Sequence, residues 1–122
     1  QEGYGMITEL GKELRKIRID RDERLMDMAD KLGKSSAFVS AIEVGKKSPP
    51  PGFEEAVAKI YELASDMATK LYQAADRARK SFTIEPSSML GRDTAGLLAR
   101  RMNELSEDQL NEINEILRKM RE

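Results

Sequence analysis

The chain has 122 residues, 35% of them charged and only 5% aromatic, with a formal net charge of −1 and no cysteine or histidine. Without thiols and imidazoles it lacks disulfides, the usual catalytic nucleophiles and bases, and the ordinary zinc ligands, so we expect neither an enzyme nor a metal or cofactor site. The small aromatic content disfavours a β-sandwich and favours an all-α fold.

The chain is predicted to begin with a disordered extension, because residues 1–6 show no periodicity. Apolar residues then recur at helical spacing and predict a first helix over residues 7–20, with its buried stripe at Leu10, Leu14 and Ile17. A second, short helix ends at Gly33, a residue type that suits the left-handed turn after a helix, and its apolar positions are Leu25, Met28, Ala29 and Leu32.

A third helix should follow, because Ser35 can cap a helix whose Val39 and Ile42 face inward. Gly45 ends it, and the three consecutive prolines within residues 46–52 require a non-helical link. Two further helices complete a unit over residues 7–80. The fourth is indicated by Phe53, Val57, Ile60 and Ala64, and the fifth by Met67, Leu71, Ala74, Ala75 and Ala78.

Residues 81–91 lose the helical rhythm and contain Pro86, which predicts a connector. A helical hairpin over residues 92–122 should follow, and its second helix begins with the spacing of a capping box at Ser106 and Gln109. That helix has a wide apolar stripe, which predicts a dimer or partner interface at Leu110, Ile113, Ile116, Leu117 and Met120.

The second and third predicted helices have the pattern of a helix-turn-helix. Ala29 is small where the two helices would touch, Gly33 permits the tight turn, and Val39 with Ile42 would anchor the second helix. The sequences LGKELRKIR (residues 10–18) and MADKLGKSSAFVSAIEVGKK (residues 28–47) resemble the Cro and cI repressor-like, or XRE-type, helix-turn-helix family. The resemblance covers about residues 7–64 and implies a five-helix, lambda-repressor-like domain that binds operator DNA as a dimer.

The resemblance also implies roles for individual residues. The positions that match the family's base-facing and backbone-facing sites are Ser35, Ser36, Ala37, Ser40, Ala41 and Val44. Arg24 and Lys46 match phosphate-contact sites, and Lys34 and Lys47 are added as phosphate contacts for their charge and position. Arg18 and Glu43 match an internal ion pair, so we expect both to be structural.

Two departures from the family pattern concern how DNA would be recognised. Leu25 stands where many relatives have a DNA-contacting glutamine, and the recognition face has no Arg, Gln or Asn to pair with base edges. Readout would then rely on short hydroxyls, on thymine-methyl contacts and on DNA shape. We therefore expect modest affinity for each half-site, which makes a homodimer more important.

These patterns predict a cytoplasmic, dimeric transcriptional repressor that reads a palindromic operator with the helix at about residues 36–44. No apolar run is long enough to span a bilayer, so no membrane association is expected. An alternative is an antitoxin or regulatory subunit that docks a toxin or protease through residues 82–122 and represses its own operon. In a third interpretation, the helix-turn-helix serves as a scaffold for protein contacts alone.

Overall fold

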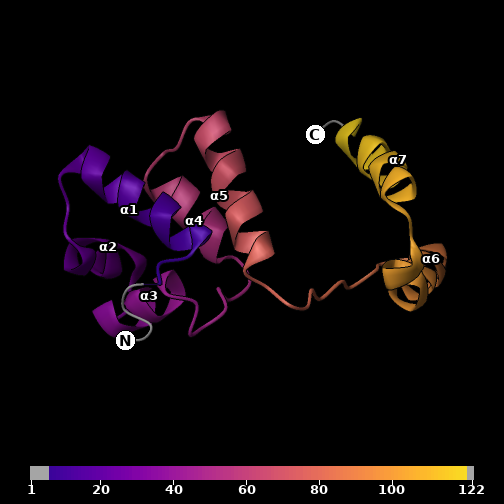
Figure 1. Ribbon diagram of the computed structural model, residues 1–122, viewed down its shortest axis with the longest axis horizontal. Coiled ribbons are helices and arrows are strands. Elements are labelled where there is room, and N and C mark those ends of the chain that lie inside the picture. The colour runs from indigo at the N-terminus through magenta and orange to yellow at the C-terminus, as the bar shows by residue number, and fades with distance from the viewer. Residues whose placement is uncertain (1–5, 121–122) are drawn as a thin grey trace. The chain divides into compact units, whose positions relative to one another are not determined.

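Seven α-helices, one short 3₁₀ helix and no strand make up residues 6–120, the part of the chain described by this computed structural model (Figure 1). The described chain divides into two units, one ending at Ser81 and the other beginning at Phe82. The all-α prediction is confirmed for these residues. Of the predicted N-terminal extension, residues 1–5 lie outside the described part, and Met6 is exposed.

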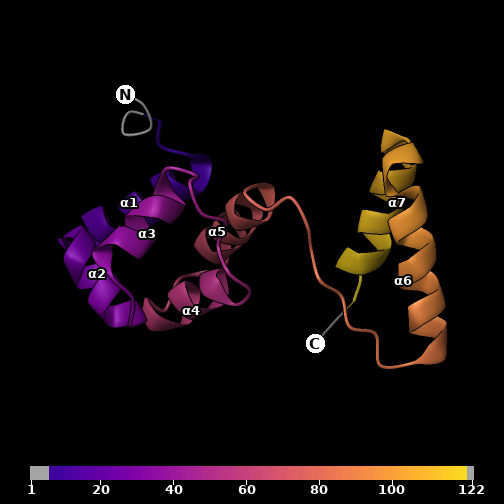
Figure 2. The same ribbon diagram turned by 90° about the horizontal axis from the view of Figure 1, so that it is seen from below.

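The first unit contains five helices that pack together: α1 (Glu9–Arg21), α2 (Leu25–Leu32), α3 (Ser36–Glu43), α4 (Phe53–Ile60) and α5 (Ser65–Arg77). Helix α1 contacts α3 and α5, while α2 contacts α3 and α4. The first and last helices of the unit therefore pack against each other, and the five helices share one core. Helix α3 lies at an outer side of this unit, at the bottom of Figure 1 and toward the reader in Figure 2.

The helix boundaries follow from local capping chemistry. Helix α1 begins two residues later than the periodicity predicts, because the Thr8 hydroxyl accepts a hydrogen bond from the Gly11 amide (3.0 Å) and so caps the helix. Ser35 caps α3 in the same way by accepting from the Phe38 amide (3.1 Å). Gly33 ends α2 with a φ of 69°, a conformation that most L-residues avoid.

The core of the first unit combines apolar side chains from all five helices. Burying one such large side chain stabilises the fold by about 1.5–3 kcal/mol. The buried core residues are Leu10, Leu14, Ile17, Met28, Ala29, Val39, Ile42, Phe53, Val57, Tyr61, Leu71, Ala74 and Ala75. Ile60 and Ala64 were expected to face inward but are exposed, and the fully buried Tyr61 takes their place at the end of α4.

Tyr61 joins α4 to the first two helices through a charged cluster. Its hydroxyl donates to Glu23 Oε1 (2.6 Å), and Glu23 also accepts from Lys31. Arg21 donates to the Tyr61 carbonyl and lies over the ring, with its guanidinium carbon 5.4 Å from the centroid. The hydrogen bonds from Lys31 and Tyr61 lower the pKa of Glu23, while burial and the Glu23 carboxylate raise the pKa of Tyr61.

A buried ion pair between Arg79 and Glu54 holds the three-proline link. Arg79, just after α5, forms two parallel bonds to Glu54 (2.7 and 2.8 Å) and donates to the carbonyls of Pro49 and Pro50 (both 3.0 Å). Burial raises the pKa of Glu54, but the hydrogen bonds from Arg79 and from the backbone outweigh burial and leave it lowered. Arg79 is therefore a structural side chain and not part of a solvated basic face.

Replacing Arg79 with methionine should lower the free energy of unfolding by about 2 kcal/mol, because the Glu54 carboxylate and two proline carbonyls lose their partner. Urea denaturation followed by far-UV circular dichroism measures this change. The Arg79→Lys variant keeps the charge but not the planar fork, so its stability should lie between those of the methionine variant and the parent chain. A methionine variant as stable as the parent would contradict the role given to this pair.

The second unit contains α6 (Met89–Arg101), a 3₁₀ turn η1 (Met102–Glu104) and α7 (Glu107–Arg118). Helix α6 begins three residues before the predicted Arg92, because the Ser88 hydroxyl accepts from the Gly91 amide (2.9 Å) and caps it there, which shortens the connector. The capping box at the start of α7 is present: Ser106 and Gln109 each donate from the backbone to the other's side chain (2.9 and 3.1 Å). Across the described residues, no helix is both long and apolar enough to cross a membrane.

Candidate nucleic-acid interface

Helices α2 and α3 meet at a tight turn, and their packing leaves one face of α3 uncovered. Val39 and Ile42 are fully buried on the inner side, as is Ala29 at the point where α2 approaches. Side chains on the outer side follow the helical period and are short and exposed or half-buried. They are Ser36, Ala37, Ser40, Ala41 and Val44. The structure thus gathers five of the six residues that were predicted to face DNA on one side of α3.

Ser35 lies outside this face and has a structural task of its own. Its side-chain oxygen accepts the Phe38 amide and starts the helix. A hydroxyl that accepts in this way still has its own hydrogen to donate. Ser35 is exposed, so this hydrogen could reach an anion near the helix start, where the helix dipole also favours negative charge.

The Arg18 and Glu43 side chains meet inside the first unit. Arg18 Nη1 lies 2.5 Å from Glu43 Oε2, and Nη2 lies 3.3 Å from Oε1. The two side chains are 9% and 3% exposed, so the pair is almost fully removed from water. Arg15 adds a longer contact to the same carboxylate at 3.5 Å. The only acidic side chain of α3 is therefore turned inward and neutralised.

The main chain of Glu43 forms a second link to α1. Its carbonyl accepts both the amide (3.0 Å) and the hydroxyl (2.9 Å) of Thr8. Gly11 follows one turn later and lies so close that a Cβ there would be 2.3 Å from the Glu43 oxygen. Sequence patterns did not reveal this backbone contact, although a glycine inside an otherwise favourable helix is the signal that could have found it.

Positive charge surrounds the outer face of α3. Residues 34–47 contain three lysines and one glutamate, and Glu43 is the glutamate. Because that carboxylate is buried and paired, the exposed charge of the segment comes from Lys34, Lys46 and Lys47. The overall net charge of −1 therefore conceals a local excess of three positive charges at the ends of α3.

Two of these lysines share an aromatic platform. The ammonium groups of Lys34 and Lys47 lie 5.2 and 5.5 Å from the centroid of the Phe38 ring, within the range of cation–π attraction. Phe38 is held in turn by Phe53 of α4, with the ring centroids 6.4 Å apart. The residues before and after α3 are thereby brought to one flank of that helix.

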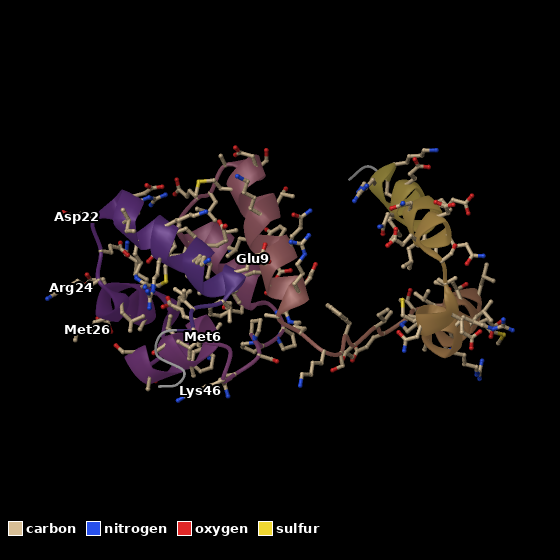
Figure 3. All side chains as sticks on the ribbon, viewed as in Figure 1. Met6, Glu9, Asp22, Arg24, Met26 and Lys46 are labelled. Atoms are coloured by element: carbon tan, nitrogen blue, oxygen red, sulfur yellow. The ribbon has the colours of Figure 1, made fainter. Side chains whose placement is uncertain are left out.

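Arg24 supplies the remaining predicted phosphate contact, from the start of α2. Its side chain is 85% exposed and has only a loose contact to Asp27 (3.9 Å), an exposed ion pair that adds little stability. Figure 3 shows the Arg24 and Lys46 side chains extending into solvent from the start of α2 and from the segment after α3. Both side chains are thus accessible to a partner.

The predicted dimer or partner residues lie in the other unit, on α7 and just beyond it. Leu110 and Ile113 are half-buried, and Ile113 lines a groove shared with α6. Ile116, Leu117 and Met120 are 65%, 58% and 71% exposed. Within the second unit, the apolar stripe is therefore only partly covered.

Among the described residues, no group of His, Cys, Asp and Glu side chains gathers closely enough to hold a metal ion. Comparison of the chain with protein-family models, with curated proteins and with solved structures finds no match.

Proposed function

We propose that the first unit binds double-stranded DNA with α3 in the major groove, and that the chain is a transcriptional repressor of the Cro and cI-like type. Occupying an operator within a promoter excludes other proteins without any catalysis. The observation that carries this proposal is the distribution of charge in residues 34–47: three lysines are exposed, and the single carboxylate is buried against Arg18. Phosphate binding depends on such local neutralisation rather than on the net charge of the chain.

The shape of α3 also supports the proposal. Eight residues form a helix about 12 Å long, and its outer side chains project little, so the backbone can approach the base edges closely. Ser36 and Ser40 can exchange hydrogen bonds with bases, while Ala37, Ala41 and Val44 can contact thymine methyl groups. These contacts are individually weak, so the proposal includes two copies acting together on a palindromic site.

The experiment is a binding titration against duplex DNA from upstream of the chain's own gene, with random duplex as competitor. The parent chain should prefer the upstream DNA, and its affinity should fall as salt rises, since cation release accompanies phosphate binding. The Ala37→Glu variant should bind about tenfold to a hundredfold more weakly, because a carboxylate in the groove faces acceptor atoms and phosphates.

Ala56→Glu is the matched control, because Ala56 is an exposed alanine on α4 rather than on α3. Both variants should keep the far-UV circular dichroism spectrum and the unfolding midpoint of the parent chain. Equal losses of DNA affinity in the two variants would show that added charge, rather than position, matters. Undiminished binding by Ala37→Glu would refute the assignment of the reading face.

A further inference from the structure

The second unit has two well-defined helices and no core of its own. Neither α6 nor α7 has a buried residue. Helices of 12 or 13 residues are marginal when isolated in water, and chains below about 40 residues seldom fold without a metal, a disulfide or association. The N-termini of α6 and α7 are nevertheless defined by the Ser88 cap and the Ser106 capping box. This unit therefore needs an apolar surface from elsewhere.

A groove between α6 and α7 shows where such a surface would fit. Apolar and polar side chains both line it. The lining residues are Thr94, Leu97, Leu98, Arg101, Leu105 and Ile113, among others. Large apolar side chains outside the groove are strongly exposed on both helices: Met89 and Leu90 (75% each), Ile116 (65%) and Leu117 (58%). Leu97, which lines the groove, is itself 57% exposed. An uncovered apolar surface of this kind indicates an interaction site.

The charges of the two helices identify the occupant. Three arginines and one aspartate give α6 a net charge of +2, whereas four acidic residues and one arginine give α7 a net charge of −3. A partner that covers both helices should therefore offer an acidic surface to α6 and a basic surface to α7. A second copy of this chain offers both at once, and each of these charged surfaces lies on a helix that also exposes apolar side chains.

We propose that residues 82–120 are a self-association module in which two α6–α7 pairs close on each other as a four-helix bundle. Helix α6 of one copy lies against α7 of the other, with the apolar stripes inside and opposite charges adjacent along the rims. This inference goes beyond DNA binding and does not depend on it. The charges on α6 and α7 play a role like that of the flanking charges that select partners in coiled coils.

The first test is the mass of the purified full chain, measured by light scattering and by sedimentation over a range of concentrations. The parent chain should have twice its 13.8 kDa mass. Leu117→Asp should be a monomer, because it places a carboxylate within the apolar stripe. Asn111→Asp adds the same charge at an exposed position on the opposite side of α7 and should remain a dimer. A monomeric parent chain, or a dimer that persists in Leu117→Asp, would overturn the proposal.

The second test asks whether the pairing runs between copies. One variant carries Arg100→Glu with Arg101→Glu on α6, and the other carries Glu112→Lys with Glu115→Lys on α7. Each should dimerise more weakly alone than the parent chain, whereas an equal mixture should regain dimers that contain one copy of each. A mixture no more associated than its components contradicts the pairing of α6 with α7. Loss of DNA binding with an intact dimer counts against the proposed function alone.

Discussion

Replacing Arg18 with methionine is expected to lower the free energy of unfolding by about 3–5 kcal/mol, the largest effect of any single change considered for this chain. The reason is the Glu43 carboxylate, which is 3% exposed and would lose its main partner while it remains removed from water. Arg15 cannot replace that partner, because it reaches the carboxylate only at 3.5 Å and from a half-exposed position. Urea denaturation monitored by circular dichroism measures the loss.

The control for this prediction removes both charges together. The double variant Arg18→Met with Glu43→Leu replaces the ion pair by apolar side chains and should recover most of the lost stability, since no unpaired charge is left buried. The main-chain carbonyl at position 43 remains available to Thr8 in both variants. If the double variant were as unstable as the single one, packing rather than the buried charge would explain the effect.

Replacing Gly11 with alanine should destabilise the first unit by about 3 kcal/mol, although alanine normally stabilises a helix relative to glycine. The added Cβ would lie 2.3 Å from the Glu43 oxygen and 2.7 Å from Ile7 Cγ1. The nearer atom belongs to the backbone and accepts two hydrogen bonds from Thr8, so it cannot move aside without breaking them. In thermal unfolding, the midpoint should fall by about 12–24 °C for a unit of this size.

Gly96→Ala is the matched control for this change. Gly96 also lies inside a helix, and a Cβ there would have only one neighbour, an Arg100 nitrogen at 3.8 Å. The control should therefore leave the thermal midpoint of the first unit unchanged. An unaltered midpoint in Gly11→Ala would mean that α1 and α3 can separate at little cost, contrary to the tight contact between them.

The sequence predicted the helices of the first unit well because their signals are local. Apolar spacing and capping residues act within one or two turns of a helix. The end of α2 and the start of α3 could therefore be predicted accurately from Gly33 and Ser35. Local patterns do not say which side chain finds a distant partner. Arg79 and Glu54 are 25 residues apart, and nothing in their immediate neighbourhoods distinguishes them from solvated charges.

Two other features, the burial of Tyr61 and the contact between Gly11 and Glu43, also depend on residues that are distant in the sequence. Tyr61 rather than Ile60 is buried at the end of α4, where its hydroxyl donates to Glu23, a partner 38 residues away in the sequence. The contact between Gly11 and the Glu43 carbonyl involves a backbone atom of residue 43, so the glycine can indicate a close approach but not which residue makes it. By contrast, the short side chains on the outer face of α3 could be identified because their helical period is regular.

The double attachment of Glu43 to α1 affects how the nascent chain folds. The Thr8 contact spans 35 residues and the Arg18 contact spans 25, so α1 emerges from the ribosome before α3 does. At about 5–20 residues per second, the interval between residues 8 and 43 lasts about two to seven seconds. During that time the apolar stripe of α1 lacks α3, and a chaperone that binds exposed apolar segments would meet α1 before α3.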